Sequence, residues 1–129
     1  MVDYPPPPEP GMTRTEWERQ LLNPWRQQLK RKLFMRRGPM CERGCGRRAV
    51  DLDEPIIPRA DMRGLDLDRR RLAFGSVNAE LACAQCNRES AHNREAAWGR
   101  AVARFGLEAM REWYNGIGLK APDRRFSGD

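Results

Sequence analysis

The four cysteines of this chain fall in two close pairs, Cys41 with Cys45 and Cys83 with Cys86, and 37 residues separate the pairs. Two short-spaced pairs of thiolates are typical of a structural zinc site, in which four ligands lie about 2.3 Å from the ion at tetrahedral corners. Glycines on both sides of Cys45 allow a tight turn that aims the first two sulfurs at a common point. We therefore expect these four cysteines to bind one Zn²⁺, whose affinity would add to the folding energy of a small domain.

Two other interpretations of the cysteines stay open at this stage. Disulfide bonds would suit the even count, but the amino terminus lacks the basic start and apolar stretch of a signal peptide. We therefore expect a reducing, cytoplasmic location. Free buried cysteines would need no pairing by spacing. No run approaches the roughly 18 apolar residues that a membrane span requires, so we expect no membrane partner.

Positive charge is the second chemical feature of the sequence. The 129 residues carry 24 Lys and Arg against 18 Asp and Glu, a net charge of +6, and the whole excess lies in residues 1–50. Arginine dominates the cations and matches phosphate with its planar fork, although a GC-rich genome also enriches arginine. One run of twelve residues holds six cations and no acid: Arg26, Lys30, Arg31, Lys32, Arg36 and Arg37. Such a run is often only a solvated face, but here we expect it to contact DNA.

The basic run lies on a predicted amphipathic helix over residues 13–38. Thr13 followed by Glu16 forms a capping box that marks the start of this helix. Pro24 is expected to interrupt it, and an apolar stripe follows at every fourth residue: Trp25, Leu29 and Leu33. The proline-rich residues 1–12 are expected to form an extended, solvated arm.

With 129 residues, the chain is short enough to form a single domain that includes the basic helix. We expect a tight hairpin over 41–50 and a strand over 50–57. Residues 59–76 lack a clean period and are read as a long loop, and 81–98 are read as a helix that begins near the second cysteine pair. Apolar residues at helical spacing continue to Gly118 and predict C-terminal helices that pack on the domain.

The segments CERGCGRRAVDLDEPIIPRADMRG and VNAELACAQCNRESAHN, which span residues 41–93, resemble the HNH endonuclease family in its zinc-bound, phage-type form. The resemblance implies an α+β, mostly helical fold with a zinc-stabilised ββα-metal core that is treble-clef-like. It also implies an origin in a phage, hence a host cytoplasm, or in a mobile element. The division of the chain is then an arm (1–12), a basic helix (13–38), an HNH-like zinc domain (39–98), C-terminal helices (99–120) and a tail (121–129).

The family hydrolyses phosphodiesters with a histidine base and a divalent ion such as Mg²⁺ or Mn²⁺. By resemblance, Asn78 matches the asparagine that orients the base, and Asn87 matches the last ligand of the catalytic metal. Glu54 stands at the position of the metal-binding aspartate. Pro55 stands at the position of the catalytic histidine, and proline offers no base.

A shift of one residue would restore part of the motif, with Asp53 as metal ligand, Glu54 as base and Asp51 nearby. The single histidine, His92, lies about 140° from Asn87 around a helix and is expected on the surface.

Three functions remain open. The first is an HNH-like protein that binds DNA through the basic helix and has a degenerate nuclease centre. The second is an active metal-dependent endonuclease that uses Glu54 or Asp53 with Asn87. The third is a protein-interaction adaptor built on the same scaffold, and the sequence leaves its protein partner and its oligomeric state open.

Overall fold

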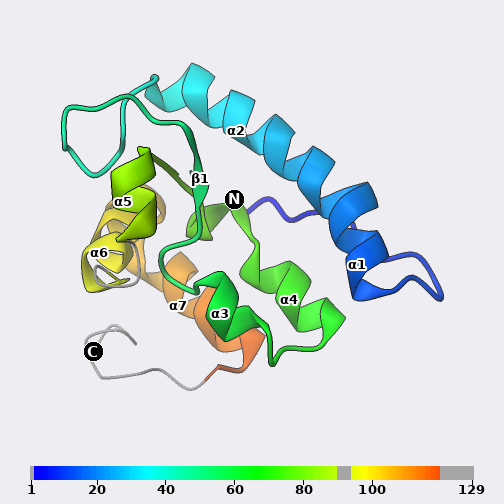
Figure 1. Ribbon diagram of the computed structural model, residues 1–129. Helices are drawn as coiled ribbons and strands as arrows, with labels where there is room; N and C mark the ends of the chain where they lie inside the picture. Colours follow the sequence, from blue (N-terminus) through cyan, green and yellow to red (C-terminus); the bar gives the residue numbers. More distant parts are fainter. Residues whose placement is uncertain (1, 90–93, 120–129) are drawn as a thin grey trace.

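The computed structural model describes residues 2–89 and 94–119 (Figure 1). The chain is rich in helices and contains one two-stranded sheet, in agreement with the predicted α+β, mostly helical class. The helices are α1 (Arg14–Trp17), α2 (Asn23–Arg37), α3 (Arg59–Met62), α4 (Leu67–Ala73), α5 (Ala84–Arg88), α6 (Arg94–Phe105) and α7 (Leu107–Ile117). A π-helical turn, η1 (Glu18–Leu22), and a 3₁₀ turn, η2 (Ser76–Asn78), complete the helical elements, and the strands are β1 (Asp51–Asp53) and β2 (Glu80–Ala82).

Helices α1 and α2 run as one long helix along the edge of the molecule (Figure 1). The predicted capping box is confirmed, because Thr13 Oγ1 accepts the Glu16 N–H and the Glu16 carboxylate accepts the Thr13 N–H. Pro24 does not interrupt the helix, contrary to our expectation. The π turn before it, in which the Asn23 N–H donates to the Glu18 carbonyl, widens the helix where proline lacks an N–H and would crowd the preceding turn.

Strand β1 pairs antiparallel with β2, with Asp51 opposite Ala82 and Asp53 opposite Glu80. The predicted strand over 50–57 is therefore shorter than expected. Its end has a local cause, since the N–H groups of Ile56 and Ile57 both donate to Asn78 Oδ1 rather than to a neighbouring strand. The chain leaves the sheet at this point and turns into α3.

Residues 59–76 contain α3 and α4, so the predicted long loop is wrong. The Asp66 side chain caps α4 by accepting the Arg69 N–H, and Met62, Ala73 and Phe74 are buried in the main core. With four and seven residues, these helices are too short to give the repeated apolar period by which a helix is recognised.

The predicted helix over 81–98 is divided in the structure. Residues 80–82 form β2, and Cys83, in extended conformation, caps the short helix α5. Residues 90–93 lie outside the described part of the chain, as do 120–129, which include the predicted tail. The C-terminal helices α6 and α7 are confirmed, with Gly106 between them and Gly118 in the left-handed conformation at the end of α7.

The proline-rich arm is extended, but it is packed against the body of the protein rather than solvated. Pro5 is fully buried, and the Trp17 indole N–H donates to the Pro6 carbonyl at 2.9 Å. The Arg71 guanidinium donates to the Pro5 carbonyl at 2.6 Å. The arm docks because its carbonyls, which have no partners within a polyproline segment, find donors on α1 and α4.

Two apolar clusters hold the elements together. The larger joins the long helix near Trp17 with α3, α4, α6 and α7. The smaller lies beneath α2, where Leu29 and Leu33 pack against Ala49, Leu52 and Leu81. This second cluster fixes α2 over the sheet and therefore sets where its charged side chains lie. No helix within residues 2–89 and 94–119 is both long and apolar enough to cross a membrane.

The contact between arm and body predicts the effect of adding one methyl group at Gly75. A Cβ there would lie 2.9 Å from Tyr4 Cε1 and 3.0 Å from Val2 Cγ1 in the arm, and 3.1 Å from the Leu72 carbonyl oxygen. A Cβ at Gly99 in α6 meets nothing within 4 Å. We expect Gly75→Ala to lower the free energy of unfolding by about 1–3 kcal/mol. Gly99→Ala should raise it by about 0.5–1 kcal/mol, since alanine favours helix. Urea denaturation measures both, and equal effects would mean that the arm is not docked as described.

Candidate metal centre and acidic cleft

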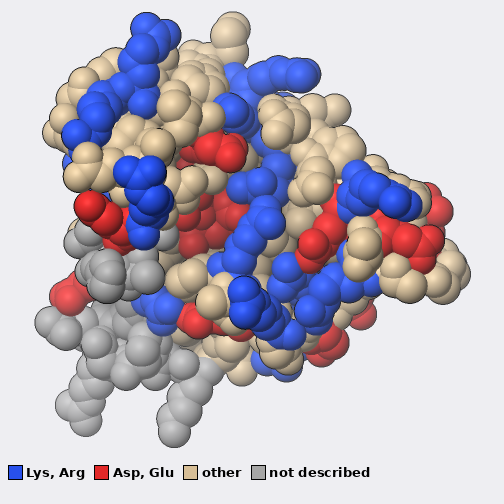
Figure 2. Space-filling view, in the orientation of Figure 1, with Lys and Arg blue, Asp and Glu red and all other residues tan. Residues whose placement is uncertain are grey.

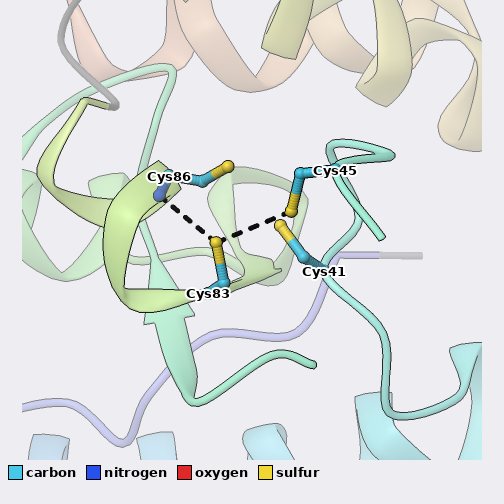
Figure 3. Close-up of side chains that lie close together, drawn as sticks. All are labelled: Cys41, Cys45, Cys83 and Cys86. Carbon is cyan, nitrogen blue, oxygen red and sulfur yellow. Dashed lines mark hydrogen bonds between the residues drawn. The ribbon is translucent and has the colours of Figure 1, made fainter. Parts of the chain in front are cut away.

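The four cysteines converge from two distant segments of the chain (Figure 3). Cys41 and Cys45 lie on the loop between α2 and β1, while Cys83 and Cys86 lie at the start of α5. The loop is held in a tight turn by Gly44 and Gly46, which both adopt positive φ. The predicted arrangement, one pair on a turn and one at a helix start, is confirmed.

The thiol cluster has the dimensions of a tetrahedral metal site. All four sulfurs lie within 4.8 Å of one another, and the Sγ atoms of Cys45 and Cys83 are 3.6 Å apart. Sulfurs at the corners of a tetrahedron with 2.3 Å metal–sulfur bonds are separated by about 3.8 Å. Within residues 2–89 and 94–119, it is the only group of three or more His, Cys, Asp or Glu side chains close enough to share one ion. The four cysteines could therefore hold one metal ion.

Hydrogen-bond donors around the cluster favour the thiolate form that metals require. The backbone N–H of Cys86 and the guanidinium of Arg47 lower the pKa of Cys83 to about 6. The backbone N–H of Arg47 likewise lowers the pKa of Cys45. Burial, followed by the neighbouring Cys83 thiol, raises the pKa of Cys86. A cation that binds the cluster would offset that last effect, because it compensates the charge of several thiolates at once.

A cleft of about 420 Å³ lies beside the metal centre, between α2, β1, α3 and α5. Three of the residues singled out for catalysis, Asp53, Glu54 and Asn87, line this cleft together with Asp51. In Figure 2 acidic side chains lie in a hollow of this face with basic side chains on both sides. The structure thus brings the HNH-like candidates together, with the exception of Asn78.

The carboxylate of Glu54 is buried and bound by two arginines. Its Oε2 accepts from Arg26 at 2.9 Å and its Oε1 from Arg59 at 3.3 Å, and only 5% of the side chain is exposed. Both oxygens therefore face a guanidinium group. A divalent ion at Glu54 would lie beside these two positive charges, which disfavours its binding.

Asp53 is likewise engaged by an arginine. Its Oδ2 accepts from Arg43, whose guanidinium also donates to the Cys86 carbonyl and lies near Glu80. Arg43 therefore joins the wall of the cleft to the metal centre.

Asn78 holds the backbone and does not line the cleft. It is fully buried, its Oδ1 accepts from the N–H groups of Ile56 and Ile57, and its Nδ2 donates to the carbonyls of Ile57 and Ala73. Every donor and acceptor of the amide is used. Asn78 thus fixes the turn that follows β1, and it has no group left with which to orient a catalytic base.

The remaining positions of the motif offer no base among the described residues. Pro55 is fully buried at the position where the family has its histidine. His92 lies outside the described residues. Asn87, on α5, is half-buried and lines the cleft, which is where a metal ligand at this position would lie.

The six cations of α2 divide into two groups. Arg26, Lys30 and Arg37 turn toward the protein, where they lie beside Glu54, Asp51 and Glu42 respectively. The other three are exposed: Arg31, Lys32 and Arg36. Arg26 and Arg37 thus form ion pairs within the protein, and Lys30 Nζ lies 3.9 Å from Asp51 Oδ1. Only the three exposed cations are left for the predicted contact with DNA.

Arginines of α6 form a network of ion pairs with the buried side chains of Glu42 and Glu80, which was not predicted from the sequence. Arg100 forms a bidentate ion pair with Glu80, in which its Nε and Nη2 donate to the two carboxylate oxygens at 2.6 and 2.8 Å. Arg104 forms ion pairs with both Glu80 and Glu42. Glu42 also accepts the Leu81 N–H. Arg100 and Arg104 lie one helical turn apart on α6, so they share one side of the helix. This spacing could have indicated that they bind a common acidic partner. The network ties α6 to the loop and to β2.

No family model, curated protein or solved structure matches this chain. The resemblance to the HNH family therefore stays a prediction, and the site must be judged on its own geometry.

The contrast between the two asparagines predicts different effects of their removal. Asn78→Ala leaves two N–H groups and two carbonyls without their buried partner, so we expect a loss of about 3 kcal/mol or more in the free energy of unfolding. Asn87→Ala, at a half-buried position in the cleft, should change stability by less than about 0.5 kcal/mol. Chemical denaturation of both variants tests the assignment, and similar losses would contradict it.

Proposed function

We propose that this chain is a zinc-stabilised, HNH-like protein of phage or mobile-element origin that binds DNA and does not cleave it. In this proposal β1, β2 and α5 are the ββα unit, and residues 39–98 are the zinc domain. The antiparallel strand pair followed by a short helix supports the assignment, as does a thiol cluster that spans the preceding loop and that helix.

Zinc is the ion that suits this donor set best. Four cysteine thiolates at tetrahedral distances are the ligands of closed structural zinc sites, and they leave no open position for a substrate. The ion would brace the fold, and any catalytic metal would need a second site in the cleft, where Mg²⁺ or Mn²⁺ would rely on Glu54, Asp53 and Asn87.

The ion pairs of Glu54 are the observation that carries the proposal of an inactive centre. A nuclease of this type needs a carboxylate that is free to bind a cation, and a base that accepts a proton from water. Here Arg26 and Arg59 already supply the positive charge next to Glu54. Proline at position 55 supplies no base. The negative charge of Glu54 is therefore already balanced by arginines of the protein itself.

DNA is the partner favoured by the exposed face of α2. Arg31, Lys32 and Arg36 are solvent-exposed, and no ion pair is found for them within the described residues. Cations without acidic neighbours repel one another and gain most from a polyanion that neutralises them together. Leu29 and Leu33 pack against the sheet and thereby anchor the helix that carries these cations.

Charge reversal on this face tests DNA binding. Arg31→Glu with Arg36→Glu should weaken binding to duplex DNA by about tenfold or more and reduce the slope of log affinity against log salt by about two. The matched control is Arg19→Glu with Arg63→Glu, which changes the charge equally at two exposed positions outside α2. Electrophoretic mobility shift over a range of ionic strength measures both. Equal losses in the two pairs would contradict contact by α2, and no binding of the parent protein at low salt would favour the protein-interaction adaptor.

An active endonuclease is the second candidate, because Asp53, Glu54 and Asn87 line one cleft. Supercoiled plasmid incubated with Mg²⁺ or Mn²⁺ distinguishes the two functions. We expect the intact protein to nick plasmid no faster than Glu54→Gln or Asn87→Ala, since Glu54 is held by two arginines and Pro55 offers no base. Nicking by the parent protein that disappears in both variants would establish the endonuclease instead.

A further inference from the structure

The positive charge of this protein is concentrated in one continuous segment. Residues 26–50 hold nine Lys and Arg and a single acid, Glu42, so that this segment carries +8 whereas the whole chain carries +6. The segment comprises α2 and the loop that brings Cys41 and Cys45 to the metal centre. Helix and loop therefore share one strongly basic region.

The nine cations fall into two groups, one paired with acidic side chains of the protein and one exposed to solvent. Four lie next to acidic side chains of the protein: Arg26, Lys30, Arg37 and Arg43. The single acid of the segment is itself occupied, since Glu42 binds Arg37 and Arg104. The other five are exposed: Arg31, Lys32, Arg36, Arg47 and Arg48. Arg47 and Arg48 belong to the loop between α2 and β1. Figure 2 shows basic side chains in the region of this loop.

The loop cations lie close to the helix cations. Met40 forms a backbone bridge with Arg48, and the Ala49 N–H donates to the Pro39 carbonyl at 2.8 Å. Arg36 precedes Met40 by four residues, so the Cα atoms of Arg36 and Arg48 are at most about 20 Å apart. One turn of duplex DNA is about 34 Å long. The two segments are therefore close enough for a single duplex to reach both within one turn.

We propose that the cysteine loop is a second DNA-contacting element, in which Arg47 and Arg48 bind backbone phosphates beside those bound by α2. The inference rests on the proposed DNA binding and adds a contact that α2 alone does not provide. Arginine suits this role, because its fork binds phosphate oxygens in pairs.

The metal centre is what holds the loop arginines in place. Among residues 42–48 none belongs to either apolar cluster, so the loop is shaped by its glycines, its hydrogen bonds and the thiol cluster. The Arg47 carbonyl accepts the Cys41 N–H, and the Arg47 Nε donates to Cys83 Sγ at 3.4 Å. Residues 47 and 48 are thus presented from a fixed turn next to the four sulfurs.

Arg48 provides the sharpest test, since its side chain is exposed and the interactions found for it with residues 2–89 and 94–119 run through the backbone. In the metal-loaded full chain, Arg48→Gln should weaken duplex binding about three- to tenfold and lower the magnitude of the salt slope by about one. Arg48→Lys keeps the charge and should retain the slope. Arg19→Gln, exposed on the long helix but outside this region, is the matched control and should change neither quantity appreciably. Arg47→Gln is measured in parallel, with its metal content determined, because Arg47 also contacts Cys83.

Each outcome of this experiment has a defined meaning. A reduced slope in Arg48→Gln, restored in Arg48→Lys and absent in Arg19→Gln, supports the loop contact. An unchanged slope in Arg48→Gln, with a reduced slope in the α2 variants, overturns the loop contact and leaves the proposed function intact. An equal loss in Arg19→Gln overturns it in favour of a diffuse effect of net charge. If no helix or loop variant alters binding, the proposed function fails as well. Competition by an acidic polypeptide that displaces DNA completely at equal charge concentration would mark the surface as a protein-binding face.

Discussion

The meeting of two cysteine pairs that lie 37 residues apart in the chain is the constraint on which this structure depends. The loop that carries the first pair leads directly into β1, and β2 leads directly into the second pair. Closing the thiol cluster therefore also brings the two strands into register. The sheet has only three residues in each strand, too few to be stable on its own in water. The cluster, together with the ion pairs of Glu42 and Glu80, supplies what the short sheet lacks.

Arginine plays two opposite roles in this protein. Turned inward, Arg26 and Arg43 neutralise carboxylates of the cleft, and the half-exposed Arg59 adds a second positive charge beside Glu54. Removing one partner of a buried pair costs several kcal/mol, so the Arg26–Glu54 and Arg43–Asp53 pairs are hard to open for a substrate or a metal. Turned outward, Arg31 and Arg36 meet no acid among the described residues and are available to a polyanion. The same residue type thus neutralises the cleft and forms the face that we propose to bind DNA.

Much of this arrangement can be read from the sequence, and the failures have physical causes. The capping box, the basic helix, the two cysteine pairs and α7 follow from local rules that tertiary packing did not override. The division of the α2 cations does not follow from helical angle alone, because at 100° per residue the exposed Arg36 lies within about 20° of the buried Leu29. The helices α3 and α4 were missed because they are too short to repeat a period. The docked arm was missed because proline-rich composition indicates only an extended backbone and says nothing of the donors on α1 and α4. The role of Asn78 depends on two N–H groups at Ile56 and Ile57, and spacing alone does not predict where they point.

Native mass spectrometry of the freshly reduced, folded chain counts the ions held by each molecule. We expect one zinc ion per chain, and we expect the Cys83→Ser variant both to lose the ion and to unfold. The matched control, Asn87→Ala, should retain both the ion and the fold. A folded parent chain without bound metal, or a Cys83→Ser variant as stable as the parent, would contradict the claim that four thiolates converging on one ion hold this fold together.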